Sequence, residues 1–172
     1  GLPNGIKHTY ENIPVHIFED EEVASERLAE KIVSSINANN GVYRLGLTTG
    51  SSPVALYRAL VRRYEAGEVS FKDVEIYSID EYYPAPADNH SRNRRLYEEL
   101  VAKVDIAKEN VHAPKLTEVH DSAYVTEFCA KYDEMASGLD LLIMGTGEKG
   151  QIGFNEFAAN EISRTRTVML PY

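Results

Sequence analysis

The sequence predicts an α/β protein in which a mostly parallel sheet is covered by helices on both faces. Short apolar segments rich in β-branched and aromatic residues alternate with longer segments of helical periodicity. Such alternation favours parallel βαβ units. With 172 residues, the chain is long enough for one domain with a substantial core. We expect residues 1–14, which are mostly polar with Gly and Pro, to form an N-terminal arm, and residues 15–172 to form the domain.

The first half of the predicted domain contains three strands and two helices. Strands are expected at 15–18, 42–47 and 74–79. The first helix lies between Asp20, a suitable N-cap, and Gly41, a stop signal. The second helix starts at Pro53, because proline is favoured in the first helical turn.

The second half continues the alternation. Helices are expected at 91–103 and 121–136, and a further strand at 167–170. Between them, "LDLLIMG" contains four consecutive apolar residues, 141–144. An unbroken apolar run predicts a strand that is buried on both faces of the sheet.

Composition excludes several classes of protein. Asp and Glu number 27 against 18 Lys and Arg, which gives a formal net charge of −9 and argues against a nucleic-acid partner. No apolar run reaches membrane-spanning length and no signal-peptide core is present, so we expect a cytoplasmic protein with no membrane partner. Cys129 is the single cysteine, and the five histidines show no metal-ligand spacing, so no metal is expected.

The end of the 42–47 strand is the first candidate site. In open parallel sheets, ligands bind beyond the carboxyl ends of the strands. The turn "GLTTGSSP" joins this strand to a helix, so it exposes backbone N–H groups and the positive end of a helix dipole, which suit an anion. It matches neither a P-loop nor a dinucleotide fingerprint. An ordinary capped turn is the alternative.

The next two strand ends carry carboxylates. Asp80 and Glu81 follow the 74–79 strand directly, where a partly desolvated carboxylate can act as a general base. The alternative is that one of them caps the next segment or pairs with a nearby Arg. After "LDLLIMG", Gly145, Gly147 and Gly150 allow close approach of the backbone to a ligand, and Glu156 follows an apolar triplet. The alternative for Glu156 is a helix cap.

These motifs together resemble one family. The segments "LGLTTGSSPVALYRALV", "VSFKDVEIYSIDEYY", "VDIAKENV", "LDLLIMGTGEKGQIGFNE" and "SRTR" are similar to those of the glucosamine-6-phosphate deaminases, also called isomerases, which belong to a wider group with the 6-phosphogluconolactonases. The triplets Asp80-Glu81-Tyr82 and Phe154-Asn155-Glu156 favour the deaminase branch. The resemblance covers about the first two-thirds of a family domain, so the domain is expected to be incomplete at its C-terminus.

The resemblance implies a Rossmann-like three-layer fold, no cofactor and a phosphorylated amino sugar as the partner. Family members open the sugar ring, move a proton between its first two carbons and release ammonia to give a ketose phosphate. By resemblance, Asp80 is the base, Glu156 assists ring opening, and Arg166 falls on an allosteric position. The substrate-binding residues implied or suggested by the turns are Thr48, Thr49, Gly50, Ser51, Ser52, Glu81, Gly145 and Gly147.

One departure from the family pattern keeps alternatives open. The usual loop reads Asp-Gly-His, and this chain has Lys149-Gly150-Gln151. A glutamine can hold a sugar hydroxyl but cannot exchange a proton at neutral pH. Gln151 is therefore expected to take a catalytic position without acid–base chemistry. The alternatives are a catalytically impaired module that binds sugar phosphates and, more weakly, a 6-phosphogluconolactonase. A homo-oligomer is also left open.

Overall fold

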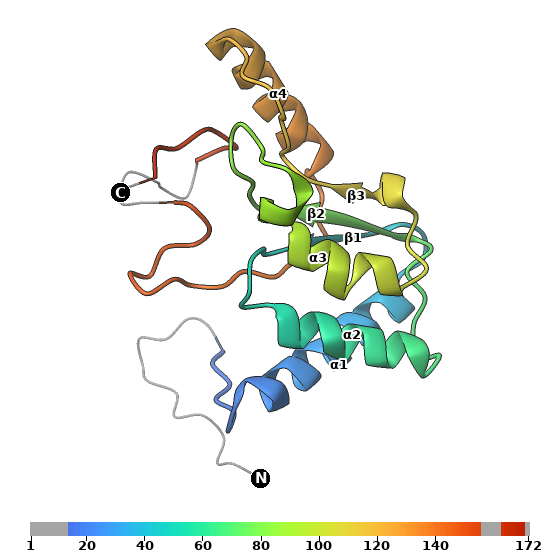
Figure 1. Cartoon of the computed structure of the whole chain (residues 1–172). Coiled ribbons are helices and arrows are strands. Elements are labelled where there is room, and N and C mark those ends of the chain that lie inside the picture. Colours follow the sequence, from blue (N-terminus) through green and yellow to red (C-terminus); the bar gives the residue numbers. More distant parts are fainter. Residues whose placement is uncertain (1–13, 156–162, 171–172) are drawn as a thin grey trace.

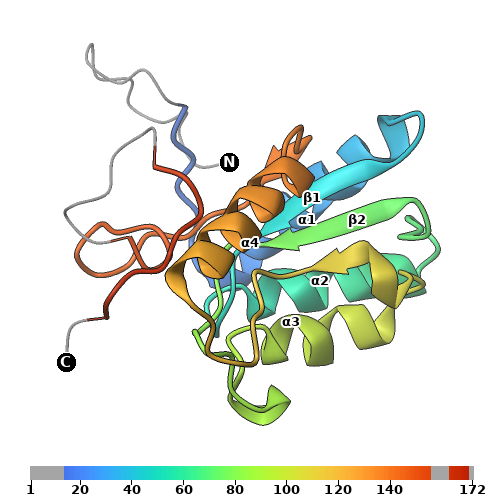
Figure 2. The same cartoon turned by 90° about the horizontal axis from the view of Figure 1, so that it is seen from above.

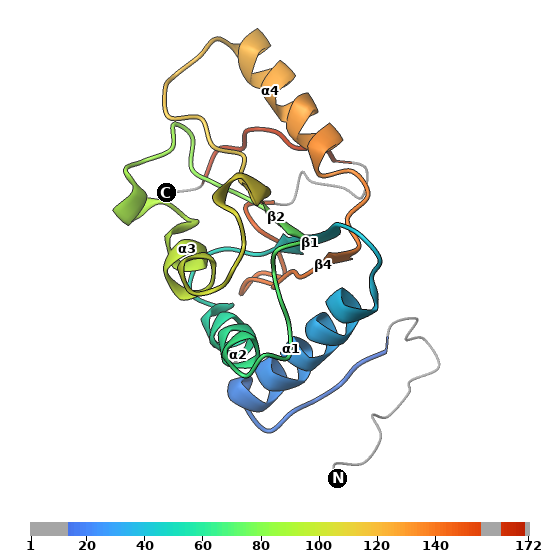
Figure 3. The same cartoon turned by 90° about the vertical axis from the view of Figure 1, so that its right-hand side faces the viewer.

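The computed structural model describes residues 14–155 and 163–170, which form an α/β unit around one parallel sheet. The strands of that sheet are β1 (Tyr43–Leu47), β2 (Val74–Ser78), β3 (Val111–His112) and β4 (Leu141–Leu142). Figures 1 and 3 show one face covered by α1 (Glu21–Ala38), α2 (Val54–Glu65) and α3 (Arg94–Glu99), and the other face by α4 (Ser122–Met135). The predicted three-layer α/β architecture is confirmed.

The order of the strands reverses direction at β1. The order is β3-β2-β1-β4, and all pairings are parallel. The chain therefore leaves β1 through α2 toward β2, whereas β4 lies on the opposite side of β1. A reversal of this kind is where open α/β sheets bind ligands, outside the carboxyl ends of the strands. Figure 2 shows β1 and β2 pointing to the same end of the molecule, where the loops after the strands gather.

Local signals in the sequence set the limits of the first two helices. The Asp20 carboxylate accepts a hydrogen bond from the Val23 N–H at 2.8 Å, and so caps α1 as predicted. The turn after α1 contains Gly41 with a φ of +116°, which favours glycine. Pro53 occupies the N-cap of α2, close to its predicted place.

The core lies between the sheet and the three helices on its first face. The Tyr43 hydroxyl donates to Ser35 Oγ at 2.8 Å, which identifies the helix-facing side of β1. Leu45 and Leu47, on the same side, are fully buried, as strand alternation requires. The helices, β2 and the turns beside them supply the other large side chains with essentially no exposure, among them Ile32, Tyr57, Leu60, Ile76, Leu96 and Leu100.

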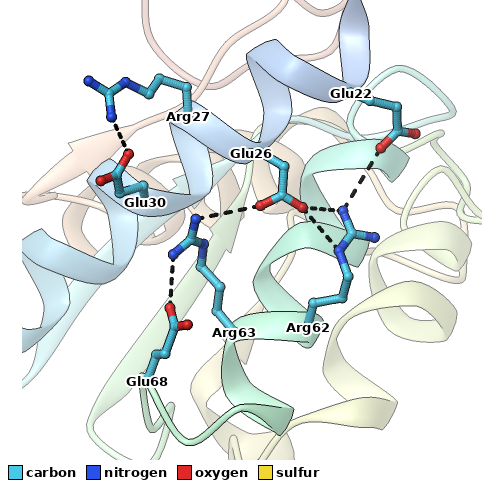
Figure 4. A network of polar contacts seen from close by, with 7 residues as sticks. All are labelled: Glu22, Glu26, Arg27, Glu30, Arg62, Arg63 and Glu68. Atoms are coloured by element: carbon cyan, nitrogen blue, oxygen red, sulfur yellow. Dashed lines mark hydrogen bonds and ion pairs between the residues drawn. The ribbon is translucent and has the colours of Figure 1, made fainter.

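A polar network joins α1 to α2 at the surface (Figure 4). Arg62 forms ion pairs with Glu22 and Glu26 of α1, and Arg63 pairs with Glu26 and with Glu68 after α2. The Arg62 side chain is 50% exposed, so water screens these pairs. The network therefore helps to fix the orientation of the two helices, while the apolar interface supplies most of the stability.

The helix on the second face is anchored to the end of β2. The Tyr132 hydroxyl of α4 donates to the Ser78 carbonyl oxygen at 2.7 Å. Burial raises the pKa of Tyr132, so the hydroxyl stays protonated and remains a donor. The N-terminus of α4 is capped by Asp121, which accepts from the Tyr124 N–H at 2.9 Å.

Two predicted strands are wrong. Residues 15–18 form no strand; Ile17 is 76% exposed, and Phe18 lines an open hollow beside Val23 instead of pairing with the sheet. Residues 167–170 form none either, because Thr165 is tied to α4: its N–H and its hydroxyl both donate to Asp133. Conversely, the sequence analysis missed β3, whose two residues pair with Ile76 and Tyr77.

The predicted strand at 139–145 is real but shorter and more exposed than expected. Only Leu141–Leu142 pair with β1, opposite Leu45 and Gly46. Leu142 is 39% exposed and Met144 is 50% exposed, so burial on both faces is incorrect here. The reason is position, because β4 is the outermost strand of the described sheet and an edge strand has one uncovered side. The predicted helix at 91–103 is likewise divided into α3 and a 3₁₀ turn, Val101–Lys103.

No helix in the described ranges is long and apolar enough to cross a membrane. The predicted N-terminal arm lies almost wholly outside these ranges, since residues 1–13 are not described.

Candidate functional site

The turn after β1 is built to present backbone N–H groups. The buried Tyr57 hydroxyl of α2 donates to the Thr48 carbonyl oxygen and holds the start of the turn. Burial and, to a lesser extent, the charge of Asp80 raise the pKa of Tyr57, so the phenol remains a donor. Gly50 adopts a φ of +84°, which turns the chain toward α2. Ser51 and Ser52 are exposed, and their N–H groups donate no hydrogen bond to any residue of the described ranges.

Asp80, just beyond β2, is joined to this turn. Its side chain is only 8% exposed, and its Oδ1 accepts a hydrogen bond from the Thr49 hydroxyl. Its Oδ2 is buried and accepts no hydrogen bond from the described part of the chain. That oxygen lies 3.4 Å from the position that a Cβ would take at Gly153, whose φ is +60°. A buried carboxylate oxygen with free lone pairs, facing a glycine, is suited to accept a proton.

Glu81 has a different environment from its neighbour. Its Oε1 accepts from the N–H groups of Tyr82 at 2.8 Å and Arg92 at 2.9 Å. Its Oε2 accepts from the Ser91 hydroxyl and from Asn93 Nδ2, the latter at 3.0 Å. A carboxylate has about four lone-pair positions, and the protein occupies all four. Glu81 therefore closes the loop between β2 and α3, and its predicted contact with substrate stays a prediction that this geometry disfavours.

The hydrogen bonds to Glu81 predict a pH-dependent stability. Burial alone would raise its pKa, but the hydrogen bonds from Ser91, Asn93 and the two N–H groups outweigh burial and lower the pKa. A lowered pKa gives stability that is present above the unfolded pKa and lost as the pH falls through the folded pKa. Glu81→Gln should thus be less stable than the wild type near pH 7, and the difference should shrink below about pH 4.5.

Urea unfolding of both proteins from pH 3 to pH 7 measures this difference. Glu118→Gln is the matched control, because it removes the same charge from an exposed position in the loop after β3. A difference between wild type and Glu81→Gln that does not vary with pH would contradict the role of the ionised carboxylate.

Arg92 is the site residue that the sequence analysis missed. Its Nε lies 3.6 Å from Asp80 Oδ1, and its guanidinium carbon lies 5.0 Å from the centre of the Phe154 ring. Its terminal nitrogens lie 3.0 and 3.2 Å from the position of a Cβ at Gly50. Tyr82 also stacks on Phe154, with ring centres 5.5 Å apart. The only signal in the sequence was the alternative that a carboxylate after β2 pairs with a nearby Arg.

The glycine-rich loop after β4 folds back on itself. Thr146 and Ile152 form an antiparallel bridge, and the Gly147 N–H donates to the Gln151 carbonyl oxygen at 2.7 Å. The Gln151 side chain covers Gly147, where a Cβ would collide with it. Its Oε1 accepts from the Lys149 N–H at 3.0 Å. Gln151 thus shapes its own loop, and the return of the chain brings Gly153 and Phe154 to Asp80 and Arg92.

Gln151→Ala should loosen this loop, because it removes the acceptor for the Lys149 N–H. One hydrogen bond contributes about 0.5–1.5 kcal/mol, so the Lys149 amide should exchange with solvent roughly two- to tenfold faster. Gln151→Glu is the control, since it retains an acceptor oxygen at the same place. Hydrogen exchange followed by NMR gives the rates. Equal exchange in wild type and Gln151→Ala would mean that the side chain does not hold the loop.

The remaining predicted site residues are less concentrated. Gly145 is exposed, with no atom within 4 Å of a Cβ built there. Arg166 donates to Asn155 Oδ1 at 3.0 Å and to the Arg164 carbonyl oxygen at 3.3 Å, which brings the 163–170 segment to the end of the glycine loop. Glu156 lies outside the described residues. The described residues include no group of three or more His, Cys, Asp or Glu side chains arranged to hold a metal ion.

Comparison with known proteins decides the family. The model for glucosamine-6-phosphate isomerases/6-phosphogluconolactonase matches residues 19–153, which include β1, β2, β4 and most of the site. The chain belongs to this family. The resemblance noted in the motifs is therefore confirmed.

Curated members of the glucosamine-6-phosphate isomerase/6-phosphogluconolactonase family are clearly similar in sequence. The chain is 36% identical over 158 residues to a glucosamine-6-phosphate isomerase of Candida albicans, covering 90% of the chain and 62% of the relative. It is 37% identical over 160 residues to a glucosamine-6-phosphate deaminase of Alkaliphilus metalliredigens, covering 91% and 64%. It thus spans less than two-thirds of the length of these relatives.

Solved structures of the family share the fold. A monomeric glucosamine-6-phosphate deaminase superposes with a TM-score of 0.79 at 24% identity, over 90% of this chain and 64% of that one. A 6-phosphogluconolactonase of Thermotoga maritima superposes with a TM-score of 0.62 at 22% identity, over 81% and 63%. Both branches of the family therefore have the architecture described above.

Proposed function

We propose that this chain acts as a glucosamine-6-phosphate deaminase, which converts an amino-sugar 6-phosphate and water to a ketose 6-phosphate and ammonia. The observation that carries the proposal is the buried, unpaired Oδ2 of Asp80 beside the turn that follows β1. The relatives named above, a glucosamine-6-phosphate isomerase and a glucosamine-6-phosphate deaminase, support the deaminase branch. We place residues 1–14 in an N-terminal arm and 15–172 in the catalytic domain, and we propose the cytoplasm as its location.

In the proposed reaction, Asp80 moves a proton between two carbons of the open-chain sugar. The aldehyde at C1 acidifies the proton on C2, the carbon that bears the amine. Asp80 Oδ2 accepts this proton, and the electron pair forms an enol-type intermediate whose charge lies on the oxygen at C1. The ammonium group on C2 gives one proton to that oxygen, and the proton held by Asp80 then goes to C1, leaving a C=N bond at C2. Water adds at C2 and ammonia leaves, which balances the reaction and accounts for its hydrolytic character.

The geometry around Asp80 fits this role. The Thr49 hydroxyl and the Arg92 side chain both lie on the Oδ1 side, so they fix the carboxylate and leave Oδ2 free. The turn at 48–52 supplies N–H groups for the phosphate, and Gly153, which has no side chain, lies beside the buried Oδ2. Gly145 and Gly147 are proposed to approach the sugar, and Glu156 is proposed to assist ring opening. Arg166 is proposed to transmit an allosteric signal through Asn155.

A second function rests on Gln151. Its Oε1 is engaged within the loop, and its amide cannot act as an acid or a base at neutral pH. This observation favours a module that binds a sugar phosphate without turning it over. A 6-phosphogluconolactonase is the weaker alternative, supported by the shared fold.

Three measurements on the same preparation separate these functions. Ammonia and ketose phosphate are assayed with glucosamine 6-phosphate, hydrolysis is assayed with 6-phosphogluconolactone, and binding of both is measured by calorimetry. The proposal expects ammonia and ketose phosphate in equal amounts. Binding of glucosamine 6-phosphate without ammonia would establish the binding module, and lactone hydrolysis alone would establish the other branch.

A further inference from the structure

The Arg92 guanidinium lies where three segments distant in the sequence meet. It faces Asp80 after β2, Gly50 after β1 and Phe154 in the glycine-rich loop. Its own main chain is fixed on both sides, because its N–H donates to Glu81 and its carbonyl oxygen accepts from the Gly50 N–H at 3.3 Å. The position of this cation is therefore set by the loop between β2 and α3 and by the turn after β1.

The donors of Arg92 are largely unused. Its Nε is buried and makes no hydrogen bond within the described chain, since 3.6 Å to Asp80 Oδ1 is too long. Nor does either terminal nitrogen donate to a residue of 14–155 or 163–170. The side chain is 29% exposed, so part of it is accessible to solvent. A group with five N–H donors and almost no protein acceptor is arranged for a ligand with several acceptors.

The charges of the site indicate which ligand. Asp80 and Glu81 are both carboxylates, and the whole chain carries a formal net charge of −9. A phosphate ester at the turn would be repelled by these groups unless a cation lies between them. Arg92 lies between Asp80 and Gly50, and its planar fork matches two phosphate oxygens. The unpaired N–H groups of Ser51 and Ser52 face the same turn.

We infer that Arg92 is a substrate-binding residue, whose terminal nitrogens hold the phosphate of the sugar against residues 50–52. The inference rests on the proposed function for the identity of the ligand as a sugar phosphate. Phe154 packs against the guanidinium and keeps it over the turn, so the glycine-rich loop contributes indirectly to phosphate binding.

The test is a titration with inorganic phosphate, followed by the NMR shifts of the amides at 50–52. Arg92→Gln should weaken phosphate binding roughly ten- to a hundredfold, because it removes a charged two-pronged contact. Arg92→Lys should lose less, since it keeps the charge but not the fork. Arg94→Gln is the matched control: it removes the same charge two residues away, where the side chain pairs with Glu98, and should bind within about twofold of wild type.

The phosphate affinity of Asp80→Asn separates a binding role of Arg92 from a purely structural one. Removal of the carboxylate releases Arg92 and removes a repulsive charge, so this variant should bind phosphate more tightly than wild type, by roughly two- to tenfold. Replacing Arg92 in the Asp80→Asn background should abolish this gain. Amide spectra of each variant show whether the fold is retained. If Arg92→Gln is unfolded, the phosphate affinities of Arg92→Lys and Asp80→Asn, each compared with wild type, decide whether Arg92 binds phosphate.

The outcomes separate this inference from the proposed function. Equal phosphate affinity in wild type and Arg92→Gln, or no phosphate binding at 50–52 in wild type, overturns the role of Arg92 even if ammonia is released. Phosphate binding that depends on Arg92, in a chain that releases no ammonia, supports the inference and overturns the catalytic proposal.

Discussion

Asp80→Asn should lower the release of ammonia from glucosamine 6-phosphate by roughly a hundred- to ten-thousandfold, which is the usual contribution of a general base. Asparagine has nearly the same shape as aspartate, so the hydrogen bond from the Thr49 hydroxyl can persist, now to the amide oxygen. What disappears is the free carboxylate oxygen opposite Gly153, which the proposed mechanism uses to accept the C2 proton. The loss should fall mainly on kcat, because binding of the phosphate does not require the base.

Asp88→Asn is the control for this comparison. Asp88 lies in the loop that follows Asp80, its side chain is 95% exposed, and it pairs with Lys115. Its replacement should leave kcat within about twofold of wild type, as for other exposed ion pairs. If Asp80→Asn retained more than a tenth of wild-type kcat, another group would have to be the base.

Leu45→Ala should destabilise the protein by about 2–5 kcal/mol, the range for deletion of a large buried side chain. Leu45 is fully buried in the central strand, between Ile76 of β2 and Leu141 of β4, and it faces the helices. β1 is paired with strands on both sides, which limits how far it can shift toward the space left by the side chain. Since a domain of this size is stable by about 5–15 kcal/mol, the loss is a large part of the total.

Chemical denaturation followed by circular dichroism measures the effect. Val42→Ala is the control, because Val42 precedes the same strand but is 53% exposed. Its replacement should change the free energy of unfolding by less than about 0.5 kcal/mol. Comparable losses in the two variants would show that burial in β1 does not dominate stability.

The parts of the site that follow strands could be predicted from the sequence. Thr49 and Asp80 each come directly after a strand, and parallel strands bring their carboxyl ends to one edge of a sheet. The hydrogen bond between them follows from that topology. The α/β architecture was predictable for the same reason, since most helices and the longer strands have clear periodicity.

The rest depends on contacts between loops, which leave no periodic signal. Arg92 is one of several charged residues in a polar stretch. Only the folded loop shows that the Arg92 N–H donates to Glu81 and that the Arg92 side chain lies beside Gly50. The two-residue β3 is too short to be distinguished from a loop by its sequence. The 167–170 segment has the composition of a strand, but the hydrogen bonds from Thr165 to Asp133 hold the preceding residues at α4.

Gly153 gives the site an unusual form of access. The wall nearest the free oxygen of Asp80 is main chain, with a backbone conformation that L side chains rarely adopt. A methyl group at this position would be strained by the backbone conformation and would lie in van der Waals contact with the carboxylate. Access of a ligand to this buried oxygen therefore depends on the position of the loop backbone, because no side chain is present at 153. In such a site, discrimination between substrates of different bulk depends on the backbone path of one loop.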